Sequence, residues 1–480
     1  MSFSGTLSSA MSGLTTAARA AELVSSNISN AMTEGYGRKE LSVSARHLGG
    51  VKIDSVIRHE DPRLSFDVRQ ARAENGGAST THDFLTRLEA MYGVPGEAGA
   101  LNTLFNEFDA RLISAAANPG SNQRLELVKQ GAQEISNKLN SLSKGIQSER
   151  KAAEFRINGQ VSELNSKLEE VHKLNIMIAK SEATQRDAFA LYDSRQRLVD
   201  DISSIIPIRV VDRQHGRIAL FTNGGAVILD SAPAEFAFTP ANEIVPHMTL
   251  AGGLLSGLTM NDKPISTSIT GPMAGGSLIA NFDIRDRYAP EAQTQLDAAA
   301  RNLIERFQSG SVDPTLGVAD AGLFTDAGTQ FDAVNEIGIS DRIEINAMID
   351  PDKGGALWRL RDGLSAASAG DVGNATILQN YSNAITQPNM LASGTLAGSN
   401  MTMADVFTTL TSDIALAATT LETRQSYATA RLVSLEQQQR ANGVDTDQEL
   451  QNLMLIEKSF AANARVLQTV DELMQTLLRM

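Results

Sequence analysis

The chain has 480 residues, and at roughly 150 residues per domain this length predicts about three domains. Apolar residues make up 42% of it, which is enough to form buried cores and too many for a wholly disordered chain. With 42 basic and 56 acidic residues the net charge is −14, which disfavours nucleic acid and anionic membranes as partners. Cysteine is absent, which excludes a disulfide scaffold, a thiolate zinc site and a cysteine nucleophile.

The N-terminal segment carries the sharpest pattern in the sequence. Apolar side chains recur at alternating spacings of four and three, as at the a and d positions of a heptad. The pattern predicts an assembly seam along one face of a terminal helix, made of Phe3, Leu7, Ala10, Leu14, Ala17, Ala21, Val24 and Ile28. The segment lacks the basic start and apolar core of a secretion signal, so we expect export without a cleaved signal peptide. No apolar run approaches the roughly 20 residues of a membrane span.

The C-terminal segment repeats this pattern. Thr446 and Glu449 have the spacing of a capping box, which predicts the start of a helix of more than roughly 30 residues. Its assembly seam comprises Leu453, Ile456, Phe460, Asn463, Leu467, Val470, Met474 and Leu477. The polar Asn463 is either a partly exposed position or a contact that sets the register of a helix pair.

The region between the two ends changes character twice. Residues 63–205 carry helical apolar stripes and a turn at 118–122, whereas 206–284 are strand-like, with hairpin turn residues. Strands are predicted at 208–212, 217–221 and 226–229. A helix follows at about 290–308, then a mixed stretch to about 373, then helices to 440. The predicted fold is therefore mainly α with a β-rich insertion and long terminal helices.

The sequence offers no motif for catalysis or for a cofactor. Its six histidines lie far apart, and none has the spacing of a zinc-binding helix. A Ser-x-x-Lys match at 141–144 falls inside an amphipathic helical pattern, without the companion motifs of a serine acyl-transferase. We expect no enzyme, no catalytic residue, no cofactor and no metal ion.

Residues 26–38 resemble the N-terminal motif of the bacterial flagellar rod, hook and hook-associated proteins, which form the axial protein family. In that motif an Asn-Ile-Ser/Ala-Asn helix end precedes a Thr-x-Gly-Tyr turn. The matching residues here are Asn27, Asn30, Gly35 and Tyr36, and Gly37 stands where Thr or Ser is usual. By itself this turn motif indicates the family and not the member.

Further stretches are similar to the hook-associated members of that family. They are residues 118–124, 191–202, 275–297 and 461–469, the last with Phe460-Ala461 where Tyr-x is usual. The likeness runs from end to end, although 311–370 aligns only loosely. It implies a structural protein at the junction between hook and filament.

The resemblance also implies an arrangement in layers. Residues 1–60 and 441–480 would form an axial core in which the terminal helices pair as a coiled coil. Residues 61–205, 283–310 and 371–440 would form a helical domain, and 206–282 with 311–370 a β-rich, mixed outer domain.

The implied partners are the hook protein, hook-associated protein 3 and further copies of the chain in a ring of about eleven. A cytoplasmic chaperone would bind the C-terminal helix before export in the unfolded state through the flagellar type III apparatus. The protein would then be extracellular, without nucleic acid and without membrane insertion.

Two other classes remain open from the sequence. One is another axial protein, such as hook-associated protein 3 or a flagellin-like protein, although length and the segments at 191–202 and 275–297 argue against it. The other is a secreted adhesin or enzyme with coiled-coil ends. A gene neighbourhood of flagellar genes would separate these classes.

Overall fold

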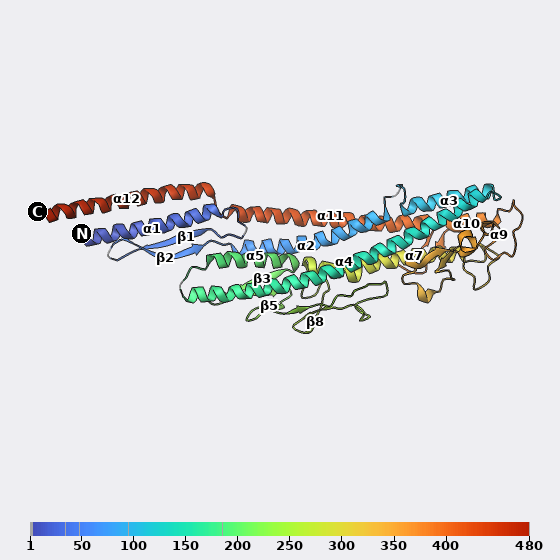
Figure 1. The fold of residues 1–480 in the computed structure, drawn as a ribbon, viewed down its shortest axis with the longest axis horizontal. Helices are drawn as coiled ribbons and strands as arrows, with labels where there is room; N and C mark the ends of the chain where they lie inside the picture. The colour runs from blue at the N-terminus through green and yellow to red at the C-terminus, as the bar shows by residue number, and fades with distance from the viewer. Residues whose placement is uncertain (1–2, 34, 48, 95, 185, 480) are drawn as a thin grey trace. The chain divides into compact units, whose positions relative to one another are not determined.

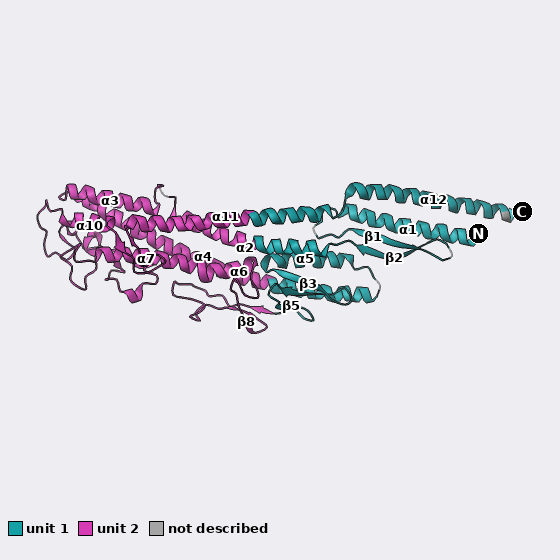
Figure 2. Ribbon diagram, turned by 180° about the vertical axis from the view of Figure 1, so that it is seen from behind, with its two compact units in different colours: residues 1–75, 164–234, 427–480 teal, residues 76–163, 235–426 magenta. Residues whose placement is uncertain are grey.

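The structure is a computed structural model that describes residues 3–33, 35–47, 49–94, 96–184 and 186–479. Most of these residues are helical, the sheets are small, and the C-terminal helix is long (Figure 1). This confirms the mainly α class predicted from the sequence. The chain forms two compact units (Figure 2), unit 1 with residues 1–75, 164–234 and 427–480, and unit 2 with 76–163 and 235–426. The three domains and the layering predicted above stay a prediction.

Three long helices contribute residues to both units: α2 (Pro62–Tyr92), α4 (Asn122–Ala183) and α11 (Met403–Ala441). Helix α4 is 62 residues long. Both predicted apolar stripes, Ile135 to Ile146 and Val161 to Ile178, therefore lie on one continuous helix, and their members are buried. The expected turn at 118–122 separates α3 (Leu101–Ala117) from α4.

Unit 1 begins and ends with the terminal helices. Helix α1 (Phe3–Ser29) and helix α12 (Thr446–Arg479) lie side by side and run antiparallel (Figure 1). The antiparallel hairpin of β1 (Lys39–Ala45) and β2 (Val51–Arg58) also packs on α1. There the amide of Val51 donates to Oγ of Ser12 at 3.1 Å. Helix α1 therefore has α12 and the hairpin as its neighbours.

The rest of unit 1 contains α5 (Phe189–Ile205) and an antiparallel sheet of β3 (Ile208–Asp212), β4 (Ile218–Thr222) and β5 (Val227–Leu229). These three strands agree with the predicted ones to within a residue or two. The side chain of Asn175 in α4 donates to the carbonyl of Ile218 and accepts from its amide. Arg195 of α5 donates to the carbonyl of Gly216 at 2.6 Å. Ile208, Leu220 and Leu229 of the sheet are completely buried.

Unit 2 has one large apolar core, to which α2, α3, α4, α7 (Ala289–Phe307), α10 (Thr376–Thr386) and α11 all contribute. Aromatic rings join distant segments there: Phe105 stacks on Phe407 at 4.4 Å, and Phe307 meets Phe324 edge-on at 5.1 Å. The strands of this unit are short. They are β6 (Phe236–Ala237), β7 (Leu258–Met260), β8 (Lys263–Ile265), β9 (Phe324–Asp326), β10 (Ile343–Ile345), β11 (Asn389–Met390) and β12 (Asn400–Met401).

The C-terminal part of the segment predicted to be strand-like is helical. Helix α6 (Gly276–Asp283) continues through a π-helical turn, Ile284–Tyr288, into α7. The strand prediction was wrong here because the short apolar run Leu278-Ile279 fits a buried helix as well as a strand. Within the turn, Arg285 is fully buried and bonds to Glu154 at 2.7 Å and Asp286 at 2.8 Å.

The remaining helical turns of unit 2 lie in the mixed stretch between α7 and α10. Two are four-residue α-helices, α8 (Ile339–Arg342) and α9 (Arg359–Asp362), and three are single 3-10 turns at Ala333–Asn335, Ala347–Ile349 and Pro351–Lys353.

Candidate functional site

No catalytic arrangement emerges from the described residues. Among them, no three acidic or histidine side chains come close enough together to hold a metal ion. None of the helices in the described ranges is both long and apolar enough to cross a bilayer.

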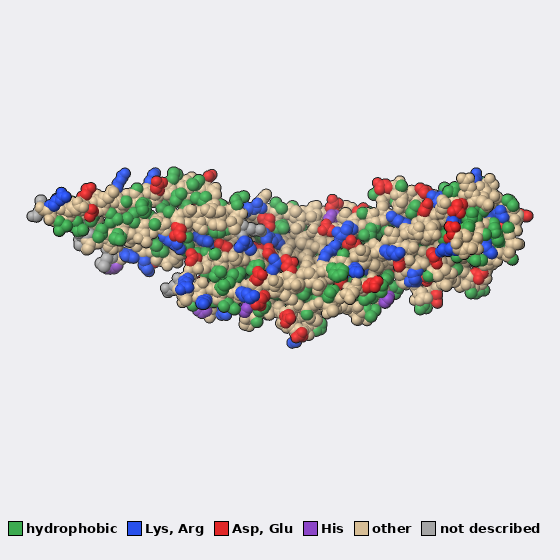
Figure 3. Space-filling model, in the orientation of Figure 1, with side chains coloured by type: hydrophobic (Ala, Val, Ile, Leu, Met, Phe, Trp, Pro, Cys, Tyr) green, Lys and Arg blue, Asp and Glu red, His purple; other side chains and the backbone are tan. Residues whose placement is uncertain are grey.

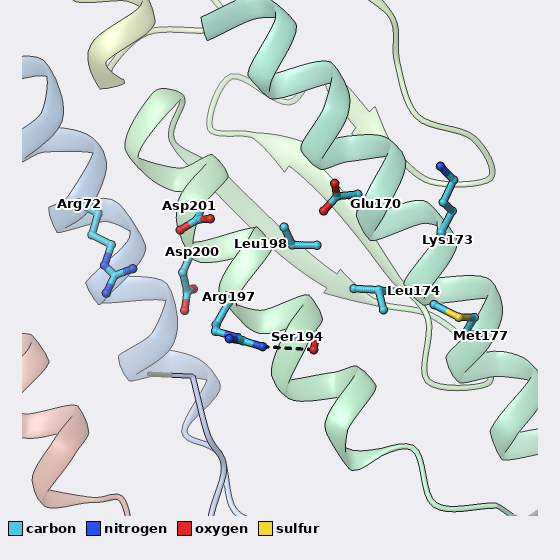
Figure 4. A pocket seen from close by; sticks show the side chains of 10 residues that line it. All are labelled: Arg72, Glu170, Lys173, Leu174, Met177, Ser194, Arg197, Leu198, Asp200 and Asp201. Atoms are coloured by element: carbon cyan, nitrogen blue, oxygen red, sulfur yellow. Dashed lines mark hydrogen bonds between the residues drawn. The ribbon is translucent and has the colours of Figure 1, made fainter. Parts of the chain in front are cut away.

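The groove that Figure 4 shows lies in unit 1 and has a volume of about 540 Å³. The side chains that line it are Arg72, Glu170, Lys173, Leu174, Met177, Ser194, Arg197, Leu198, Asp200 and Asp201. Its one hydroxyl, on Ser194, accepts a hydrogen bond from Arg197 at 3.4 Å and is not paired with a base. Burial raises the pKa of Asp200. Arg69 opposes this rise, because its Nε lies 2.7 Å from Oδ1 of Asp200 and stabilises the charged carboxylate. The carboxylates of Asp200 and Asp201 thus form ion pairs, with Arg69 and Lys167.

The turn motif forms a buried polar network at the C-terminal end of α1. The side chain of Asn27 is completely buried. Its Nδ2 donates to the carbonyl of Lys39 at 2.8 Å and to Oε2 of Glu449 at 3.1 Å. Its Oδ1 accepts from the amide of Lys39 at 3.0 Å and from the hydroxyl of Tyr36 at 2.9 Å. One asparagine thus joins the end of α1, the start of β1 and the start of α12.

Glu449 is the partner that sequence reasoning missed in this network. Its carboxylate is 1% exposed and also accepts from Nε of Arg38 at 2.8 Å. That hydrogen bond raises the pKa of the Arg38 guanidinium. The predicted capping box was wrong, because Asp445 caps α12 with bonds to the amides of Asp447 and Gln448. The Glu449 side chain is therefore available to Asn27 and Arg38.

Asp193 of α5 holds the other side of the turn. Its Oδ1 accepts from Nε of Arg58 at 3.0 Å and from the amide of Gly37 at 3.3 Å, and Lys39 lies 3.5 Å from Oδ2. Gly35 has a φ of +77°, which favours glycine, and a β-carbon there would lie 2.8 Å from Cγ of Arg197. The turn is thus fitted closely against α5.

Asn30 lies apart from this network. Its Nδ2 donates to the carbonyl of Ser26 at 2.9 Å, and its Oδ1 accepts from Thr33 at 3.3 Å. It therefore stabilises only the last turn of α1, whereas Asn27, Gly35 and Tyr36 contact other elements.

We call Asn27, Tyr36, Arg38 and Glu449 the terminal network.

The two predicted seams face each other only in part. Ala10, Ala17, Val24 and Val470 are buried. Half-buried positions are Leu7, Leu14, Ala21, Ile28, Leu453, Ile456, Asn463 and Leu467. Phe460 and Met474 are exposed, at 46% and 44%. The side chains of Phe3 and Leu477 lie outside the described part of the structure. The role of these residues in assembly stays a prediction.

Helix α12 also carries a second apolar stripe that the sequence reasoning did not single out. Leu455, Ala462, Val466 and Leu473 follow one another at spacings of seven, four and seven, which is again a heptad pattern. Leu455 is 64% exposed, Val466 40% and Leu473 49%. Figure 3 shows apolar side chains gathered on the left of the view, over the region where Figure 1 places α12 and both termini. Within this chain, the seam of α12 is partly buried, whereas the second stripe is exposed.

Comparison with known proteins matches three parts of the chain to family descriptions. Residues 85–310 match the "Flagellar hook-associated protein FlgK helical domain". Residues 438–480 match the "Flagellar basal body rod FlgEFG protein C-terminal" family, and 7–36 the "Flagella basal body rod protein" family. The last two matches cover all of α12, and most of α1 together with the turn that follows it.

Curated relatives align with almost the whole chain. The chain is 24% identical to flagellar hook-associated protein 1 of Bacillus subtilis over 515 residues, covering 98% of each chain. It is 23% identical to the protein of that name from Salmonella typhimurium and 22% to that from Escherichia coli, covering 99% of each chain. A solved structure, the flagellar hook junction protein FlgK from Burkholderia pseudomallei, superposes with a TM-score of 0.44 and 19% identity, over 56% of this chain and 49% of that one.

Proposed function

Because the chain belongs to the flagellar hook-associated protein 1 family, we propose that it joins hook and filament at their junction in the bacterial flagellum. The family is one of structural flagellar proteins, located outside the cell. In this proposal the chain is exported unfolded and assembles through its terminal helices. It acts by packing and not by catalysis.

The observation that carries this proposal is the second apolar stripe of α12. Fully burying a Leu or Val side chain stabilises by about 1.5–3 kcal/mol. In the isolated chain Leu455, Val466 and Leu473 are still about half exposed, so they realise only part of that gain. Contiguous exposed apolar surface on a soluble protein marks an interaction site. A second helix against this stripe, supplied by a neighbouring subunit, would bury it.

We also propose that α1 and α12 pair as a coiled coil. The pair Asn27–Glu449 and the pair Gly13–Asn463 are fourteen residues apart on each helix. A straight α-helix drifts by about 20° per heptad, so two heptads would turn the contact by about 40°. Both contacts nevertheless lie on the facing sides of the helices, which favours a repeat of 3.5 residues per turn.

The partners we propose follow the position at the junction. They are the hook protein on one side, hook-associated protein 3 on the other, and copies of this chain in a closed ring of about eleven. A cytoplasmic chaperone that covers α12 before export would protect the exposed stripe from premature contacts.

The experiment is complementation of a gene deletion in the native bacterium, with export and filament growth measured separately. Leu473→Asp places a charge on the second stripe, where the isolated chain leaves the side chain 49% exposed. Folding and export should therefore be retained. Incorporation would bury that charge unpaired, so we expect protein in the medium and hooks without filaments.

Gln468→Asp is the matched control, because it adds the same side chain at an exposed position of α12 away from both apolar faces. It should support normal filaments. Normal filaments with Leu473→Asp would refute assembly through this stripe. Normal filaments in the deletion strain itself would refute the proposed function.

A further inference from the structure

Two contacts between α1 and α12 fall in a single antiparallel register. At one end, Nδ2 of Asn27 donates to Glu449. Further along the pair, Asn463 lies over Gly13, where a β-carbon would be 2.6 Å from Nδ2, 2.8 Å from Cγ and 2.9 Å from Oδ1 of the asparagine. Moving fourteen residues along α1 and fourteen back along α12 leads from one contact to the other. The two contacts therefore describe one alignment of the helices.

The same alignment brings the two apolar seams together. Continued residue for residue, it places Leu7 within one residue of Val470, Ala17 within one of Phe460, and Val24 within one of Leu453. The seams alone do not fix this alignment. Because each repeats every seven residues, a slide of α12 by seven again sets apolar side chains against apolar ones.

The polar contacts do distinguish the alignments. A slide of seven residues one way carries Glu449 beyond the C-terminal end of α1, and a slide the other way sets it level with Ala20. Either movement separates Glu449 from Asn27 and Arg38. A carboxylate that is 1% exposed then loses the donors that offset its burial.

The same slides displace Asn463 from Gly13. They set it level with Ala20 or with Thr6, whose β-carbons fill the space that Gly13 leaves open. Rotation of the amide about its own axis does not relieve the conflict, since Cγ itself lies 2.8 Å from the position of a β-carbon. The whole side chain would have to turn and lose its bond from Nδ2 to the carbonyl of Ser459, 3.0 Å long.

We infer that the contacts Asn27–Glu449 and Gly13–Asn463 set the register of α12 on α1. This inference rests on the proposed function and adds to it. The register of the two helices determines where along the pair each residue of the second stripe lies, and therefore which part of a neighbouring subunit it can contact. Asn463 and Glu449 are thus positioning residues, and the apolar seam supplies the adhesion.

The absence of cysteine permits a direct test in the purified full-length chain. Ala17→Cys with Phe460→Cys reports the observed register. Ala17→Cys with Leu453→Cys, or with Leu467→Cys, reports a slide of seven residues in either direction. In the otherwise unchanged chain, mild oxidation should cross-link the first pair at least tenfold more than either of the others.

The register should relax when the polar contacts are replaced by leucine. In a Glu449→Leu, Asn463→Leu background the helices still pair, and we expect the ratio of observed to displaced cross-links to fall at least tenfold. Gln448→Leu with Gln451→Leu, at exposed positions of the same helix, is the control and should leave the ratio unchanged.

Three outcomes would overturn the inference. They are displaced cross-links in the unchanged chain, an unchanged ratio in the Glu449→Leu, Asn463→Leu background, and loss of every cross-link there, which would mean that the polar contacts hold the helices together rather than align them. The cross-links are read without assembly into a flagellum. Their result is therefore independent of the complementation experiment.

Discussion

At the scale of residues, the most consequential side chain is an asparagine with no exposed surface. Asn27 uses both of its polar atoms, and its partners come from positions 36, 39 and 449. A buried amide stabilises a fold only when such partners are present, because each unpaired donor or acceptor costs about 1–3 kcal/mol. The terminal network meets that condition and connects segments 422 residues apart.

Asn27→Ala should destabilise unit 1 by about 3 kcal/mol, since Lys39, Tyr36 and Glu449 each lose a partner. Asn30→Ala is the matched control, and it should cost no more than about 1 kcal/mol, because Asn30 is half-buried and bonds only within its own turn. Urea unfolding followed by far-UV circular dichroism measures both. Equal losses for the two variants would contradict the special role of Asn27.

Part of this site could be predicted from the sequence. The turn motif identified Asn27, Gly35 and Tyr36, because glycine at a positive φ and a paired asparagine have local sequence signatures. It did not identify Glu449 or Asp193 as partners, because an ion pair between residues 411 or 135 positions apart leaves no local pattern. Glu449 was assigned to a capping box that its spacing from Thr446 fits, and only the fold reveals that Asp445 provides the cap.

At the scale of elements, strong periodicity predicted well and short apolar runs did not. The heptad patterns predicted both terminal helices, and period-two alternation predicted β3, β4 and β5. The apolar stripes of α4 were foreseen, but their union into one helix of 62 residues was not. Helix α6 was missed because eight residues are too few for the helical period to stand out.

The loop that follows β8 should be dispensable for folding. A β-carbon on Gly271 would lie 2.9 Å from the carbonyl oxygen of Ser266, so the ends of this loop approach each other closely. Replacing 266–271 with Gly-Ser should change the free energy of unfolding by less than about 0.5 kcal/mol, as for other exposed surface positions.

Cutting into β4 is the contrasting change. Ala219 and Leu220 are completely buried there, so removal of 217–222 should prevent folding of unit 1. A folded variant without β4, or an unfolded one without 266–271, would contradict this description of the segment.

At the scale of the whole molecule, the chain divides into a unit that contains both termini and a unit with a large apolar core. The length of the chain predicted about three domains, and the family resemblance added their order. Neither supplied the division inside α2, α4 and α11, because a long helix shows no break in its sequence period where its neighbours change. The second stripe of α12 likewise could not be recognised as an exposed surface until the fold showed that α1 packs against another face of the helix.

The terminal helices should be the part of the isolated chain that is most easily cleaved. Ordering each backbone residue costs about 1–2 kcal/mol, and a seam on α1 with alanine at three of its eight positions offsets only part of this. Mild proteolysis of the purified chain should therefore cut within α1 and α12 before it cuts within 62–440. The same ends should resist cleavage in isolated flagella. Equal protection in both states would show that assembly does not stabilise them.

We propose that this chain stands between hook and filament and is held there by its terminal helices. A cryo-electron microscopy map of the junction in flagella from the native bacterium tests this directly. We expect density for this chain at the junction, with α1 and α12 paired in the innermost layer and Leu455, Val466 and Leu473 buried against a neighbouring subunit. A junction built without this chain, or one in which the second stripe of α12 faces solvent, would contradict it.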